Sequence, residues 1–148
     1  MKIGIANDHH GVELKKRIII YLEKKGIEYK NYGCDTTENT GNIDYVDYAV
    51  SLCKDIQNKS IDCGILVCGT GIGMSIVANK MKGIIAGKVN TPKEARLIKE
   101  HNMANVMTLA EYTEKLEEIL DNFLNTKPST EERHHRRVKK ILDLENNQ

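Results

Sequence analysis

A cysteine at the end of an apolar run, followed at once by a glycine-rich turn, is the part of the sequence best suited to chemistry. The run from Gly64 to Cys68 indicates a buried strand, and Gly69-Thr70-Gly71-Ile72-Gly73 follows it before a helix. Glycine lets the main chain approach a ligand closely, and free N–H groups at a helix start carry partial positive charge. An anion would be stabilised there, and the same field favours the thiolate form of Cys68. The segment therefore predicts a reaction site.

This glycine pattern matches neither of two common phosphate-binding motifs. A dinucleotide fingerprint starting at Gly69 needs glycine at position 74, where the chain has Met74, and the turn lacks the lysine of a P-loop. A cysteine that ends a buried strand is also often only a small core residue, and a glycine turn can serve the fold alone. The functional interpretation therefore depends on the combination of strand, cysteine and turn.

Two segments with histidine are further candidates. Asp8-His9-His10 directly follows the first predicted strand, where it could bind a polyol or an anion, although such a pair is often solvated surface. A metal site is disfavoured because no third ligand follows at a suitable spacing. His101-Asn102 ends a predicted helix, where the helix dipole stabilises a cation and histidine exchanges protons near neutral pH. A simple C-terminal cap is the alternative interpretation.

The densest positive cluster, residues 133–137, falls in the last predicted helix. Arg133 and Arg137 lie four residues apart and share one helix face, where two guanidinium groups suit a phosphate. A solvated helix balanced by Glu131 and Glu132 is the competing interpretation. RNA binding is disfavoured because no aromatic residues alternate with the basic ones for base stacking.

Composition narrows the class of protein. The length of 148 residues suits one domain, 1–148. The chain has 22 Lys and Arg and 21 Asp and Glu, so its net charge favours neither nucleic acid nor an acidic membrane as a partner. Four cysteines without Cys-x-x-Cys or zinc-site spacing predict free thiols in a reducing compartment. Met1-Lys2 leads straight into a strand, without an apolar segment suited to a signal peptide or a membrane helix. We therefore expect a cytoplasmic protein.

Short apolar runs alternate with segments of helical period along the chain. Strands are expected near 2–6, 28–32, 64–68, 84–89 and 106–109. Helices are expected around Leu14–Leu22, from Asp44 through Ile56, at Ser75–Lys80, from Thr91-Pro92 to about His101, at Glu114–Leu124 and at Glu131–Leu144. This alternation favours a Rossmann-like, three-layer α/β/α fold, doubly wound, with five mostly parallel strands and a C-terminal helix. Right-handed crossovers bring the Asp8-His9 loop and the glycine turn to the same carboxyl edge of the sheet.

In this order the segments resemble the B-type ribose-5-phosphate isomerases and the galactose-6-phosphate isomerase subunits, from Met1 to about Val138. The motifs that carry the resemblance are Asp8-His9, Asp44-Tyr45, Gly64 to Gly73 with Ser75 and Ala78-Asn79-Lys80, His101-Asn102 with Asn105, and Arg133-His134 with Arg137. Members of this family are cofactor-independent aldose–ketose isomerases of sugar phosphates. The resemblance thus implies an isomerase with no cofactor and no metal.

The resemblance also implies the catalytic residues. Cys68 would move a proton between C1 and C2 of the open-chain sugar, Thr70 would assist, and His101 would open the furanose ring. The enediolate oxygen would be stabilised by backbone amides of the turn, which are those of Gly69, Gly71, Ile72 and Gly73.

Substrate binding and assembly follow from the same resemblance. The implied binding residues are Asp8 and Asn102 for sugar hydroxyls, His9, Arg133 and Arg137 for the phosphate, and Tyr45. In this family the site lies between two subunits, so a homodimer or tetramer is implied, with the helix at about 131–144 contacting a partner. The implied partner molecule is a small sugar phosphate, not a nucleic acid or a membrane.

Three positions depart from the family pattern and bear on the choice of sugar. Val46 replaces a frequent proline, Ile85 a frequent arginine, and Tyr112 an arginine able to reach phosphate. The resemblance favours conversion of ribose 5-phosphate to ribulose 5-phosphate. The alternatives are a six-carbon substrate, galactose 6-phosphate or allose 6-phosphate, and a non-catalytic module that binds sugar phosphates.

Overall fold

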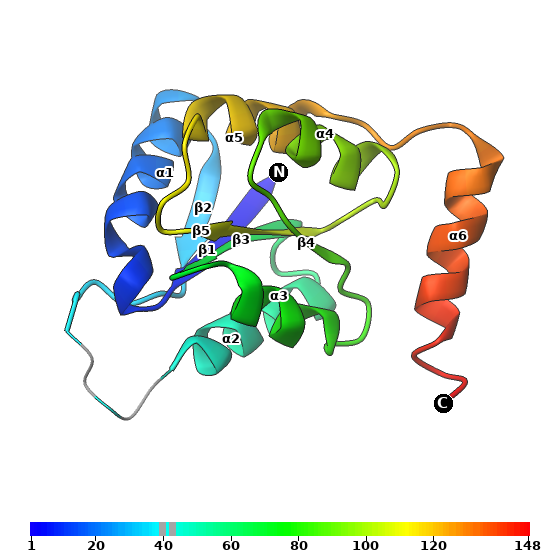
Figure 1. Cartoon of the computed structure of the whole chain (residues 1–148), viewed down its shortest axis with the longest axis horizontal. Coiled ribbons are helices and arrows are strands. Elements are labelled where there is room, and N and C mark those ends of the chain that lie inside the picture. Colours follow the sequence, from blue (N-terminus) through cyan, green and yellow to red (C-terminus); the bar gives the residue numbers. More distant parts are fainter. Residues whose placement is uncertain (39–40, 42–43) are drawn as a thin grey trace.

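A parallel β-sheet is the centre of the computed structural model (Figure 1). The structure describes residues 1–38, 41 and 44–148, and in these residues five strands are ordered β2-β1-β3-β5-β4, each parallel to its neighbours. The strands are β1 (Lys2–Asn7), β2 (Glu28–Asn31), β3 (Cys63–Cys68), β4 (Ala86–Lys88) and β5 (Val106–Ala110). The helices are α1 (Val12–Lys24), α2 (Tyr45–Gln57), α3 (Ile72–Asn79), α4 (Pro92–Glu100), α5 (Leu116–Asn125) and α6 (Glu132–Asp143), with a 3-10 turn η1 (His9–Gly11). The predicted α/β fold is confirmed.

Helices cover both faces of the sheet, as a doubly wound fold requires (Figure 1). Helices α1, α4 and α5 pack on one face, and α2 and α3 pack on the other. Along β3, Ile65 and Val67 pack in the core on the side of α1, α4 and α5, whereas Leu66 and Cys68 pack in the core on the side of α2 and α3. Successive side chains of a strand point to opposite faces, so burial on both faces explains why β3 is apolar along its whole length.

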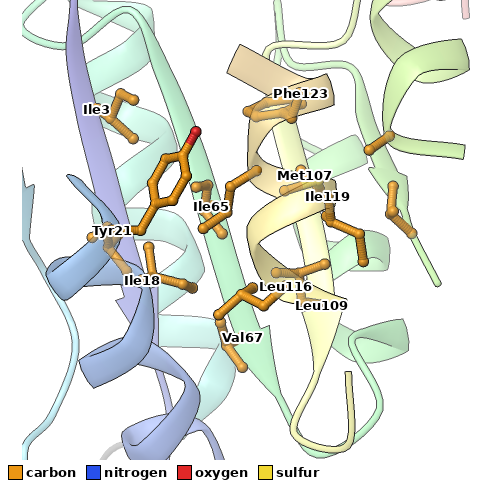
Figure 2. Close-up of a cluster of buried hydrophobic side chains, with 14 of the residues drawn as sticks. Ile3, Ile18, Tyr21, Ile65, Val67, Met107, Leu109, Leu116, Ile119 and Phe123 are labelled. Carbon is orange, nitrogen blue, oxygen red and sulfur yellow. The ribbon is translucent and has the colours of Figure 1, made fainter. Parts of the chain in front are cut away.

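Figure 2 shows the core between the sheet and the helices α1 and α5. Ile18 of α1 and Phe123 of α5 face Ile65 and Met107 of the central strands, and all four are fully buried. Burial of each such side chain contributes about 1.5–3 kcal/mol to folding. This packing holds the strands in register, so that their carboxyl ends form a common edge.

The caps of two helices confirm the predicted starts. Asp44 accepts the Val46 N–H at 3.1 Å and begins α2 with a capping box. Thr91 accepts the Glu94 N–H at 3.1 Å and begins α4, with Pro92 as its first residue. Both caps satisfy N–H groups that have no acceptor within the helix.

Two elements differ from the expectation. Helix α3 begins at Ile72 rather than near Ser75, because Gly71 adopts a left-handed φ of 75° that turns the chain directly into the helix. A second glycine at position 73 hides the helical period in the sequence. Strand β4 is limited to three residues, shorter than the expected 84–89, because it pairs only with β5 at the edge of the sheet.

Helix α6 lies beside the rest of the fold, outside both helical layers (Figure 1). Before it, the Ser129 N–H donates to the Glu100 carbonyl at 2.8 Å, and beyond it the Glu145 carboxylate accepts the Gly83 N–H at 2.8 Å. Its buried side chains are those of His134 and Val138. Neither α6 nor any other helix in the described residues has the length and apolar character needed to cross a membrane.

Candidate active site

The carboxyl edge of the sheet holds the cysteine and the glycine turn. Cys68 ends β3, is 5% exposed, and packs in the core cluster beneath α2 and α3. Its sulfur accepts the Gly71 N–H at 3.2 Å, so the thiol is directed toward the turn. On the neighbouring strand β5, the Thr108 hydroxyl donates to the Gly71 carbonyl at 2.8 Å and fixes the turn from the other side. The sulfur therefore lies where the core meets the turn.

Two glycines of the turn leave no room for a side chain. A Cβ at Gly71 would lie 2.9 Å from the carbonyl carbon of Leu109, in addition to the strain of its positive φ. A Cβ at Gly73 would lie 2.7 Å from the ring of Tyr45. Tyr45 therefore packs directly on the turn from the start of α2.

The first turn of α3 supplies N–H groups to the same place. The Ser75 N–H makes the first intrahelical bond, to the Gly71 carbonyl, and before it the Ile72 N–H donates to the Thr70 hydroxyl, both at 3.2 Å. The opening N–H groups of a helix lack intrahelical acceptors and carry the positive end of its dipole. The arrangement can stabilise negative charge that develops close to Cys68.

Asp8 and His9 reach the same edge from β1. The Asp8 N–H donates to the Val67 carbonyl at 3.2 Å, and the carboxylate accepts the His10 N–H at 3.0 Å, which makes Asp8 the cap of η1. Asp8 is buried and His9 half-buried. The structure thus places Asp8, His9, Cys68 and the turn on one edge, as the sequence predicted.

His101 and Asn102 lie at the opposite, amino edge of the sheet. Helix α4 begins after β4 at the carboxyl edge and runs back, so that its C-cap, His101, lies near the strand starts. Soon afterwards the Asn105 carbonyl accepts the Gly64 N–H, at the beginning of β3, at 2.9 Å. The five residues of β5 separate the two edges by about 16 Å, at about 3.3 Å per residue. One chain therefore does not bring His101 to Cys68.

His101 instead meets the first turn of α6. Its ring stacks on that of His134, with centroids 4.1 Å apart and planes 7° from parallel. Arg133 and Arg137 are exposed four residues apart on the same helix, and Arg133 pairs with Glu131. Desolvation of His134, with His101 and Arg133 nearby, lowers its pKa below the usual value. The predicted site residues thus form two groups, one at each edge.

Two polar residues at the carboxyl edge escaped the sequence analysis, Thr108 and Glu111, and so did the contact between Glu111 and His10. Nδ1 of His10 lies 3.2 Å from the Glu111 carboxylate, which links the loops after β1 and β5. These loops are neighbours only because β1 and β5 both flank β3, and no local motif marks that order. In the described part of the chain, no three His, Cys, Asp or Glu side chains gather as a metal site.

The positions that depart from the family pattern lie in different surroundings. Val46 and Tyr112 are exposed, at 37% and 63% respectively. The N–H of Ile85 donates to the Asn105 side chain at 2.9 Å, near the amino edge. Of these positions, Tyr112 lies beside Glu111 at the carboxyl edge.

Comparison with known proteins identifies the family. The sequence profile of the Ribose/Galactose Isomerase family matches residues 3–141. The chain belongs to this family. Ribose-5-phosphate isomerase B of Escherichia coli is 36% identical over 147 residues, which cover 97% of this chain and 96% of the relative. Family membership identifies the protein as an isomerase of the aldose–ketose class that acts on sugar phosphates.

Solved structures in the Ribose/Galactose Isomerase family share the whole fold. The ribose 5-phosphate isomerase of Thermotoga maritima superposes with a TM-score of 0.89 at 42% identity, covering 96% of this chain and 97% of its own. Ribose-5-phosphate isomerase B of Mycoplasma genitalium, solved with bound ribulose-5-phosphate, gives a TM-score of 0.89 at 36% identity, covering 99% and 97%.

Proposed function

We propose that the protein interconverts ribose 5-phosphate and ribulose 5-phosphate through an enediolate. The observation that carries this proposal is the Cys68 sulfur, held 3.2 Å from the Gly71 N–H at the start of α3. Relatives of known structure along nearly the full chain are ribose-5-phosphate isomerases, and one of them holds ribulose-5-phosphate. These relatives favour the five-carbon sugar over six-carbon substrates.

In the proposed reaction Cys68, as thiolate, removes the proton from C2 of the open-chain aldose and returns it to C1. As the proton leaves, charge develops on the carbonyl oxygen, and the amides of the turn, Gly69, Gly71, Ile72 and Gly73, stabilise it. The Thr70 hydroxyl assists the proton transfer between the two oxygens. Tyr45, which packs on Gly73, borders the bound sugar.

The remaining proposed groups come from a second copy of the chain. His101 opens the furanose ring, Asn102 binds a hydroxyl, and Arg133 and Arg137 bind the phosphate, whereas Asp8 and His9 act from the subunit that supplies Cys68. Two observations support this division: His101 lies at the edge opposite Cys68, and His101 and the two arginines lie together around the start of α6. A homodimer in which two copies face each other would complete two sites.

Exposed apolar residues next to the turn support such a dimer. Ile72 and Ile76 are 52% and 58% exposed and lie one helical turn apart on α3, near Tyr45 and Val46 of α2. Exposed apolar patches on otherwise polar surfaces commonly mark interfaces. A second copy seated here would also be next to Cys68, as the proposed shared site requires.

We place the enzyme in the cytoplasm, because its cysteines are free: Cys34, Cys53, Cys63 and Cys68.

Substitution of Cys68 tests the proposal directly. Cys68→Ala should lower kcat with ribose 5-phosphate by about a hundredfold to ten-thousandfold, the usual contribution of a general base. Cys63→Ala, at the other end of β3, is the matched control and should keep its kcat. Turnover should be measured with ribose 5-phosphate, galactose 6-phosphate and allose 6-phosphate. Near-normal activity of a folded Cys68→Ala protein, or a higher kcat/KM for a six-carbon sugar, would contradict the proposal.

A further inference from the structure

A contact between His10 and Glu111, outside the proposed binding residues, connects the loops that build the site. His10 and Glu111 lie 3.2 Å apart, Nδ1 to carboxylate, with about half of each side chain exposed. His10 belongs to η1 after β1, and Glu111 directly follows β5. The pair therefore spans the carboxyl end of β3, where Cys68 and the glycine turn lie.

The backbone holds both partners against that turn. The Glu111 N–H donates to the Gly69 carbonyl at 3.3 Å, and a Cβ at Gly69 would lie 3.8 Å from the His10 ring. A Cβ at Gly11 would lie 2.8 Å from the Val67 carbonyl, so the η1 turn packs closely against the end of β3. The His10 ring thus lies between Gly69 on one side and the Glu111 carboxylate on another.

His10 in turn bounds the position of His9. The two rings have centroids 4.1 Å apart and are inclined by 40°. The His10 ring therefore limits how far the His9 ring can turn toward it. The charged and titratable groups that face His10 are Glu111 from the β5 loop and Asp8 and His9 from its own turn.

We infer that Glu111 and His10 are positioning residues that hold His9 in the orientation in which it binds the phosphate of the substrate. The inference deepens the proposed function and depends on it, because phosphate binding by His9 is part of that proposal. Glu111 fixes the His10 ring, His10 fixes the His9 ring, and neither of the two needs to contact the substrate. Their loss should weaken binding of the phosphate group and leave the proton transfer at Cys68 intact.

The test compares Glu111→Ala and His10→Ala with the double variant, and Glu114→Gln on the same loop serves as the control. Each single change should raise KM for ribose 5-phosphate and Ki for inorganic phosphate by about threefold to fivefold, the range of a single hydrogen bond, with kcat within twofold of normal. Because both act through one contact, the double variant should match the singles rather than multiply their effects. Glu111→Gln, which keeps an oxygen acceptor for Nδ1–H, should fall between wild type and Glu111→Ala.

Three outcomes would overturn the inference: an unchanged KM and Ki in both single variants, a loss confined to kcat, or fully multiplicative effects in the double variant. A merely structural role would change unfolding without this split between KM and kcat. Failure of the proposed function is distinguishable, because wild-type protein would then lack turnover of ribose 5-phosphate. If wild type is active and the Glu111 and His10 variants bind phosphate normally, only the positioning role fails.

Discussion

Two inactive variants should together restore activity if the active site is shared between copies. The two groups of site residues lie on opposite edges of the sheet, about 16 Å apart along the five residues of β5. Proton transfer needs contact within about 3 Å. His101 of one chain therefore cannot act at the same sugar as Cys68 of that chain. Cys68→Ala and His101→Asn should each be inactive alone.

A heterodimer of these two variants has a defined expected activity. In a twofold symmetric dimer, one site would receive both altered residues, and the other would receive the intact Cys68 and the intact His101. Heterodimers purified through two different affinity tags should have about half the wild-type kcat per dimer. A site built within one chain would leave both sites defective.

Heterodimers of Cys68→Ala with wild type serve as the control, since they should show about half activity under either arrangement. Turnover should be followed with ribose 5-phosphate at saturating concentration. If the control has half activity and the doubly altered heterodimer is as inactive as its parents, the shared site is refuted.

Three further predictions concern stability and reactivity. Gly71→Ala should lower the free energy of unfolding by about 1–3 kcal/mol. Gly83 has a similar φ of 77° but open space around it, so Gly83→Ala should lower the free energy of unfolding by less. Equal losses in urea titrations would contradict the contact between position 71 and Leu109. Iodoacetamide at pH 8 should modify the partly exposed Cys34 before Cys53 and Cys63, because burial raises the pKa of Cys53 to about 12 and of Cys63 to about 11. Labelling of Cys53 or Cys63 ahead of Cys34, seen by mass spectrometry, would be inconsistent with their packing. Desolvation lowers the pKa of His134, so the unfolded chain binds that proton more readily than the folded chain does. The free energy of unfolding should therefore fall as pH drops below the ordinary histidine value of about 6.5. His134→Phe should reduce the difference between the free energies of unfolding measured in urea at pH 7.5 and pH 5, and an unchanged difference would argue against this effect.

The fold was largely predictable because its signals are local. Asp44 and Thr91 cap the helices that their side chains predicted, and the apolar run that ends at Cys68 forms the central strand. Parallel order follows from alternating strands and helices. The start of α3 was missed because the left-handed Gly71 and a glycine two residues later resemble a loop rather than the first turn of a helix.

The arrangement of the site was only partly predictable. Asp8 follows β1 and Cys68 ends β3, so the rule that loops gather at the carboxyl edge places them together. His101 ends a helix, and its position depends on the direction in which that helix returns along the sheet. The pairing of His10 with Glu111 depends on the order of strands in space, which no spacing along the chain encodes.

If two copies share the active site as proposed, the exposed isoleucines of α3 make the activity depend on protein concentration. Ile72 belongs to the turn proposed to bind the oxyanion and Ile76 follows one helical turn later, yet both side chains are more than half exposed in the single chain. Separation of the two proposed subunits would expose this surface to water and, in the same event, remove His101 from the shared site. Specific activity should therefore decline on dilution. Single subunits should aggregate most readily, because their apolar side chains are exposed.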